Sequence, residues 1–221
     1  GKPNLRAPRP LQCNNALLLC SIVAGPARVW SHSETKVVTV MPIQIPTRLK
    51  DGTPVLLRPL QSEDEARLRE GIARLSDRSR YFRFFTGARH LPDTVVKRLV
   101  DVDGDHHIGW GGLDMQAEGG PAAIGAAHAM REDNGPEAEL AFGILDAYHG
   151  QGLARMLIAA VIRDCLEQEI TRLRAEVLSE NRNAQRLLRH IGATFVDCEG
   201  PVTVYRLACE EAEACLRAAP R

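Results

Sequence analysis

The spacing of hydrophobic residues in the first third of the chain predicts a short hairpin followed by a helix. A turn at residues 51–52 separates two extended segments, which is typical of a β-hairpin. Leu68, Ile72 and Leu75 then recur at helical spacing. This pattern predicts a first helix over residues 63–75.

Local signals indicate where further helices begin. Ser62 and Glu65 are three residues apart before the first helix, which is the spacing of a capping box. Pro92 opens a further helix, because proline fits the first helical turn and a one-sided apolar pattern follows it. Between these helices, the segment RSRYFRFF at residues 78–85 interleaves arginines with aromatic residues. We interpret it as an amphipathic helix.

Three segments with strand-like composition follow, at residues 106–113, 122–130 and 137–145, with turn-rich sequence between them. They predict an antiparallel meander. The period changes after Gly152, where apolar residues recur at offsets 0, 3, 4, 7, 8 and 12 counted from Leu153. We expect a long amphipathic helix that packs on the meander.

The rest of the chain predicts a strand at residues 172–178, a helix at 183–192 that ends at its glycine, and a final pair of strands. We expect a core domain over residues 46–208, followed by a tail or short helix at 209–221. The order of elements predicts an α/β fold, with a mixed, mostly antiparallel sheet flanked by helices.

Composition narrows the possible partners. The chain has 221 residues, of which 44% are hydrophobic, and its 28 lysines and arginines equal its 28 aspartates and glutamates. This balance argues against nucleic acid and against an anionic membrane surface as partners. No run of eighteen apolar residues occurs, so the sequence predicts no membrane-spanning helix and a soluble protein.

Residues 1–40 differ from the rest, because they carry five basic residues against one acid and an apolar run, ALLLCSIVAG. This order resembles a secretory signal. Since Met41 opens an ordinary-looking protein start, we expect residues 1–40 to be an N-terminal extension outside the core domain, added in cloning or read from an upstream start. A targeting segment, or an apolar hairpin against the domain, is the alternative.

Cysteine and histidine spacing predicts neither a disulfide scaffold nor a metal site. The six cysteines are irregularly spaced, with no C-x-x-C pair, so a reduced, cytoplasmic setting is expected. His106 and His107, with His90 upstream, could suggest a metal cluster. Their spacing fits no closed zinc motif, and adjacent residues on a strand point to opposite faces. We therefore expect no metal.

The segment FGILDAYHGQGLARMLI predicts a strand, a glycine-containing loop and the start of a long helix. Such a junction directs unpaired backbone N–H groups and the positive end of the helix dipole toward one spot, where an anion can bind. Gly150 and Gly152 let a phosphate approach the backbone. The loop matches neither the P-loop nor the dinucleotide fingerprint. Simple turn chemistry remains the alternative.

This loop and a second motif resemble the GCN5-related N-acetyltransferases (GNAT). HGQGLA at residues 149–154 is similar to the family's pyrophosphate loop for coenzyme A, Gln/Arg-x-x-Gly-x-Gly/Ala. ENRNAQRLLRHIGA resembles the second signature, N-x-x-A-x-x-L and a glycine turn, through Asn181, Ala184, Leu187 and Gly192. The likeness covers residues 48–207 and is greatest to bacterial protein lysine acetyltransferases. It implies a single GNAT-like acetyltransferase domain that uses acetyl-CoA.

The resemblance also implies where acetyl-CoA binds. The strand around residues 142–145 runs along the pantetheine arm, and a backbone N–H there polarises the thioester carbonyl. Two departures stand out: His149 replaces the usual Gln or Arg, and Leu188 replaces the tyrosine that protonates the leaving sulfur in many members. Tyr148 and Tyr205 are weak substitutes as the acid. The expected cofactor-binding residues are Phe142, Ile144, Leu145, His149, Gly150, Gln151, Gly152, Leu153, Ala154, Arg155 and Asn181.

Glu139 is the expected catalytic residue. An amine acceptor is mostly protonated at neutral pH, so transfer needs a base. Glu139 in EAELAFGIL occupies the position where the resembling lysine acetyltransferases place theirs. Glu137 lies on the same strand face and is the rival.

The identity of the amine acceptor is indicated by the resemblance alone. It implies a protein lysine, such as that of an acyl-CoA synthetase, as the preferred amine. A small amine or amino acid as acceptor, and a non-catalytic acyl-CoA-binding regulatory module, are the alternatives. A homodimer is left open. RSRYFRFF is expected to line the acceptor groove rather than to bind single-stranded nucleic acid.

Overall fold

The structure is a computed structural model that describes residues 43–218. The interpretation of residues 1–40 lies outside the described residues.

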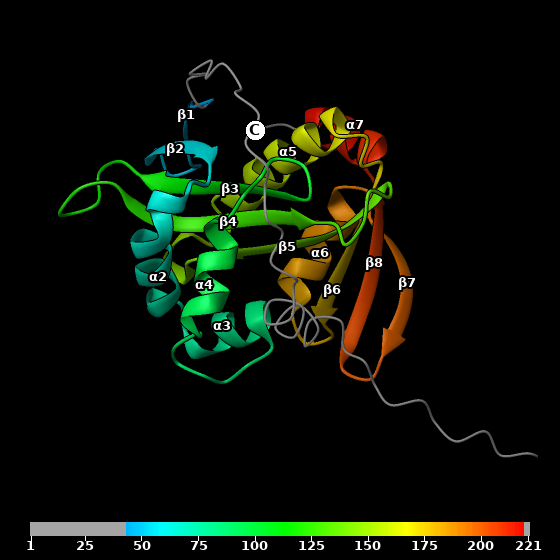
Figure 1. The fold of residues 1–221 in the computed structure, drawn as a ribbon, viewed down its shortest axis with the longest axis horizontal. Coiled ribbons are helices and arrows are strands. Elements are labelled where there is room, and N and C mark those ends of the chain that lie inside the picture. Colours follow the sequence, from blue (N-terminus) through cyan, green and yellow to red (C-terminus); the bar gives the residue numbers. More distant parts are fainter. Residues whose placement is uncertain (1–42, 219–221) are drawn as a thin grey trace, which may run out of the picture.

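One mixed sheet of eight strands forms the centre of the molecule (Figure 1). Its strand order is β1-β2-β3-β4-β5-β6-β8-β7, and every neighbouring pair is antiparallel except β5 and β6. The predicted mixed, mostly antiparallel sheet is confirmed. The strands are β1 (Ile45–Arg48), β2 (Pro54–Pro59), β3 (His107–Asp114), β4 (Ala122–Met130), β5 (Glu137–Ile144), β6 (Arg172–Leu178), β7 (Thr194–Glu199) and β8 (Val202–Ala208).

Helices cover both faces of the central strands. α2, α3 and α4 pack on one face, where α2 contacts β4 and α3 contacts β5. α5 packs on the other face against β3, β4 and β5, as the period change predicts, and α7 packs on α5 and β8. The helices are α2 (Glu65–Arg74), α3 (Asp77–Phe84), α4 (Asp93–Val100), α5 (Leu153–Glu167), α6 (Arg182–His190) and α7 (Cys209–Ala218), with short 3-10 turns η1 (Ser62–Asp64) and η2 (Asp146–Tyr148).

The first helix begins differently from the expectation. A capping box between Ser62 and Glu65 is wrong, because the structure forms it one residue earlier, between Gln61 and Asp64. The reason is Arg58, whose guanidinium donates two hydrogen bonds of 2.6 Å to the Asp64 carboxylate. Asp64 also accepts the backbone N–H of Gln61 at 3.1 Å. This ion pair fixes Asp64 as the capping acid.

The core includes apolar residues of β3, β4 and β5 and the buried face of α5. Leu157, Ile158, Val161 and Ile162 of α5 are fully buried. They lie on one side of the helix because their spacing is that of an amphipathic helix. Within residues 43–218, no helix is long and apolar enough to cross a membrane.

Candidate active site

The two parallel strands part in the middle of the sheet. β5 and β6 pair only over residues 137–139 of β5 and 172–174 of β6. Beyond Glu139, β5 continues alone on that side as far as Ile144. We refer to the place where β5 and β6 are no longer paired, beyond Glu139 and toward the loop after β5, as the opening between these strands.

Backbone groups of β5 face this opening. The Leu145 N–H donates to the carbonyl of Ile124 in β4. Since main-chain groups alternate along a strand, the N–H and C=O groups of Phe142 and Ile144 point the other way, toward the opening. The carbonyl of Ile144 accepts a hydrogen bond from His149, and the remaining groups form a strand edge to which an extended amide chain such as pantetheine can bind.

The loop that follows has the glycine conformations that its sequence predicts. Gly150 and Gly152 adopt φ angles of +75° and +92°, which are rarely adopted by other residues. Gly152 is the N-cap of α5, so the first N–H groups of this fifteen-residue helix are exposed next to it. A Cβ on Gly150 would meet nothing within 4 Å. The loop leaves backbone donors accessible to an anion.

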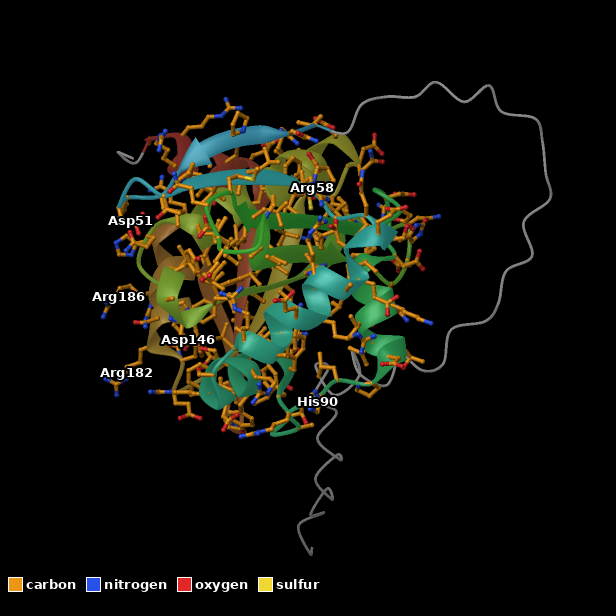
Figure 2. All side chains as sticks on the ribbon, turned by 90° about the vertical axis from the view of Figure 1, so that its left-hand side faces the viewer. Asp51, Arg58, His90, Asp146, Arg182 and Arg186 are labelled. Atoms are coloured by element: carbon orange, nitrogen blue, oxygen red, sulfur yellow. The ribbon has the colours of Figure 1, made fainter. Side chains whose placement is uncertain are left out.

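Lys50 lies beside this loop, which the sequence does not reveal. Its backbone N–H donates to the carbonyl of Gln151 at 3.2 Å, and its Cε is 4.0 Å from where a Cβ of Gly152 would be. In Figure 2, Asp51 of the same turn lies along the same edge of the view as Arg182 and Arg186 of α6. Pairing of β1 with β2 brings the turn there, and sequence spacing carries no signal for that contact.

Three expected cofactor residues also make contacts within the protein. His149 donates from Nε2 to the carbonyl of Ile144 at 3.0 Å. Arg155 donates to the carbonyl of Leu216 in α7 at 2.6 Å. Asn181 caps α6 by accepting the N–H of Ala184 at 3.2 Å. Their roles in holding coenzyme A stay predictions.

Glu139 lies at the point where the strands part. Its Oε1 is buried and has no hydrogen-bond partner in the described part of the chain. Burial, and secondarily Glu176, raises the pKa of the Glu139 carboxyl to about 7, against the opposing effect of Arg83. A carboxylate with this pKa can accept and release a proton near neutral pH.

Glu137 has a different environment, although it lies on the same face of β5. Its Oε2 is 3.4 Å from Nε of Arg172 and 3.5 Å from Nε of Arg206. About a third of its side chain is exposed. Two ion pairs make Glu137 a surface counter-ion, so the structure favours Glu139 over its rival as the base.

A pocket opens on the same face as Glu139, between this sheet face and α2–α4. Apolar side chains including Ile72, Phe84 and Leu99 line it, together with Arg83 and His128. Most of the segment RSRYFRFF lies in α3, and two of its residues, Arg83 and Phe84, line the pocket. We refer to this space as the acceptor pocket, because RSRYFRFF is expected to line the acceptor groove.

Sequence reasoning missed Arg83 and His128 as site residues. Arg83 packs over Gly143, where a Cβ would be 3.4 Å from its Cγ, and burial lowers the pKa of its guanidinium to about 10. Its guanidinium lies over the ring of Phe84, 4.8 Å from the ring centroid, and the charge of Glu139 opposes the lowering of its pKa. The interleaved arginines of RSRYFRFF were the available signal, whereas His128 in AAIGAAHAM gave none.

The two tyrosines considered as substitutes for the acid make hydrogen bonds within the protein. Tyr148 donates to Asp114 at 2.7 Å, and the buried Tyr205 donates to Gln185 at 3.2 Å. Leu188 is fully buried. Within residues 43–218, no group of three or more potential metal ligands occurs.

Comparisons with known proteins place this geometry in a family. Residues 55–194 match the family model described as Acetyltransferase (GNAT) domain. The chain is 29% identical over 154 residues to the "Acetyltransferase Pat" of Mycolicibacterium smegmatis, an alignment that covers 69% of this chain and 45% of that protein. The chain therefore spans less than half the length of this relative.

Solved structures show the same fold. The GNAT domain of S. lividans PAT superposes with a TM-score of 0.68 at 28% identity, covering 75% of this chain and 96% of that one. Spermidine N-acetyltransferase from Vibrio cholerae, solved with CoA and spermine, has a TM-score of 0.56 at 16% identity, covering 72% and 97%, and shows the fold alone. The family model matches more than half of the chain, and the chain belongs to the GNAT acetyltransferase family.

Proposed function

We propose that this domain transfers an acetyl group from acetyl-CoA to a primary amine, with a protein lysine side chain as the preferred acceptor. The observation that carries the proposal is Glu139, a buried carboxylate with an unpartnered oxygen where β5 and β6 part. Membership of the GNAT family supplies the reaction class.

The opening between β5 and β6 fits the pantetheine arm. The backbone edge at Phe142 and Ile144 hydrogen-bonds its amides, and a backbone N–H there polarises the thioester carbonyl. The loop from His149 to Ala154 and the first turn of α5 bind the pyrophosphate. Lys50 adds a positive charge beside that loop.

Glu139 acts as the base. It takes a proton from the acceptor ammonium, directly or through water, and the neutral amine nitrogen then attacks the thioester carbon. The carbon–sulfur bond breaks and the thiolate of coenzyme A leaves. The second proton that the nitrogen must lose to become an amide passes to this thiolate or to water. A thiol with a pKa of about 8.5 leaves as thiolate at modest cost near neutral pH, so the reaction does not require a tyrosine in place of Leu188.

The preference for a protein lysine is supported by likeness to the mycobacterial Pat and by the apolar walls of the acceptor pocket. A lysine side chain has an aliphatic stem that such walls can bury. The lysine of an acyl-CoA synthetase is the first protein acceptor to examine. Spermidine represents the small-amine alternative, since one structural neighbour is named for it.

The test is release of free coenzyme A thiol from acetyl-CoA in the presence of lysine peptides, an acyl-CoA synthetase and spermidine. We expect amine-dependent release that is fastest with a lysine-containing protein. Faster release with spermidine would replace the acceptor assignment. Tight acetyl-CoA binding without release for any amine would identify a regulatory binding module instead.

A further inference from the structure

Two buried histidines contact each other at the wall of the acceptor pocket. His107 in β3 and His128 in β4 are 6% and 2% exposed. Their ring centroids are 5.2 Å apart, and Nε2 of His107 lies 2.9 Å from Nδ1 of His128. Gly109 pairs with His128 across the strands, and a Cβ there would come within 3.2 Å of that Nδ1. The glycine leaves room for the ring pair.

The hydrogen bonds determine which nitrogens carry protons when both rings are neutral. Nδ1 of His107 lies 3.0 Å from the backbone carbonyl of Asp101, which can only accept, so this nitrogen carries the proton. Nε2 of His107 is then an acceptor, and Nδ1–H of His128 donates to it. Nε2 of His128 is left with its lone pair.

Both rings are neutral at physiological pH. Burial lowers the pKa of His107, and burial together with His107 and Arg83 lowers the pKa of His128 well below its usual value. His128 therefore serves as a hydrogen-bond acceptor and not as a general base.

The sheet register places His128 next to the candidate base. Strand β4 pairs His128 with Ala141, Met130 with Glu139, and Ala126 with Gly143. Because side chains alternate along a strand, the side chains of His128 and Glu139 lie on the same face of the sheet. Arg83 packs over Gly143 on that face. His128 lines the acceptor pocket, and among residues 43–218 none donates to its Nε2.

We infer that Nε2 of His128 accepts a hydrogen bond from the acceptor amine and thereby fixes the direction of the lone pair that attacks the thioester. The inference rests on the proposed function, since it concerns the same pocket. Glu139 accepts one N–H and removes that proton, whereas His128 accepts a second N–H without removing it. His107 is a positioning residue, because its lone pair holds the His128 proton on Nδ1.

Kinetics with a lysine peptide at saturating acetyl-CoA test this role. His128→Leu removes the acceptor, so the KM for the amine should rise about tenfold, the scale of one hydrogen bond, while the KM for acetyl-CoA stays unchanged. His128→Gln keeps an acceptor oxygen and should restore most of the amine affinity. His106→Gln changes the exposed neighbouring histidine and should behave as wild type.

Spectra of wild-type protein labelled with ¹⁵N-histidine provide a readout that does not depend on a variant folding. We expect neutral His107 and His128 at pH 7 with the proton on Nδ1 in both. A His128 proton on Nε2, or a charged ring, would overturn the inference.

Different results would contradict the role of His128 and the proposed function. Amine turnover with an equal amine KM in wild type, His128→Leu and His128→Gln would contradict the inference and leave the proposed function intact. A wild-type protein that acetylates no amine would overturn both.

Discussion

At the residue scale, two glutamates on one strand face differ in what surrounds them. Glu137 is held by Arg172 and Arg206, whereas Glu139 has a buried oxygen without a partner. The pKa of about 7 at Glu139 follows from burial and from Glu176. Position along the strand does not distinguish these residues, but their neighbours from β6 and β8 do.

Glu139→Gln should lower amine turnover by about a hundredfold or more, the scale of losing a general base. Acetyl-CoA affinity should stay nearly unchanged, because the amide has the same shape. Thiol release and calorimetry measure the two quantities. Glu137→Gln is the matched control and should retain turnover within about threefold, since it removes only surface ion pairs.

The pH dependence of turnover should reflect the protonation of Glu139. The base must be deprotonated, so kcat/KM should rise about tenfold per pH unit below pH 7 and level off above it. A profile in wild type without an inflection near pH 7 would remove Glu139 from this role.

The free energy of unfolding should fall as the pH rises, because the folded protein favours the protonated form of Glu139. The folded-state pKa of about 7 exceeds the usual 4.5, so the folded protein binds this proton more tightly than the unfolded chain. The stabilisation is fully present below pH 4.5 and is lost as pH rises to 7, a change of up to about 3 kcal/mol. Denaturant unfolding at several pH values should show a smaller loss in Glu139→Gln than in wild type.

At the element scale, the start of α5 and the turn before it connect the two halves of the candidate site. Gly152 ends the loop in a left-handed conformation and caps the helix. Upstream, the carboxylate of Asp146 accepts the N–H of Ser76 at 3.0 Å and the hydroxyls of Ser76 and Ser79 at 2.7 Å. These bonds attach the start of α3, the helix of Arg83, to the turn before the cofactor loop.

Gly152→Asp should abolish acetyl-CoA binding, because it places a carboxylate against the pyrophosphate site. We expect a loss of affinity of more than about a hundredfold by calorimetric titration. Gly104→Asp is the control, since Gly104 also has a positive φ, +78°, in the loop between α4 and β3. Equal losses in both variants would show that backbone strain, and not charge at the loop, is responsible.

Asp146→Ala and Ser79→Ala, alone and combined, test the attachment of α3. Each substitution removes the same hydrogen bond between Ser79 and Asp146. The loss of unfolding free energy in the double variant, measured by chemical unfolding, should therefore be smaller, by about 1 kcal/mol, than the sum of the two single losses. Additive effects would show that the contact contributes nothing to stability.

At the scale of the whole molecule, local patterns predicted most elements because hydrophobic period and turn residues are local properties. The meander of β3, β4 and β5 and the long helix α5 occur where their periods indicate. The capping acid was misplaced, since Arg58 selects Asp64 through a contact that spacing does not encode.

The site was predictable in part for the same reason. The cofactor loop and Glu139 lie in continuous motifs, so the resemblance could indicate them. The parting of β5 and β6, the packing of Arg83 over Gly143 and the bond between His107 and His128 each depend on pairing between distant segments. Register across strands, and not sequence order, brings these groups together.

The proposed reaction requires that the opening between β5 and β6 holds acetyl-CoA. Calorimetric titration of the purified chain with acetyl-CoA, with NAD and ATP as controls, tests it most directly. We expect saturable binding of acetyl-CoA with a Kd in the micromolar range, about −8 kcal/mol, and no binding of either control. Absence of acetyl-CoA binding, or equal binding of ATP, would contradict the account.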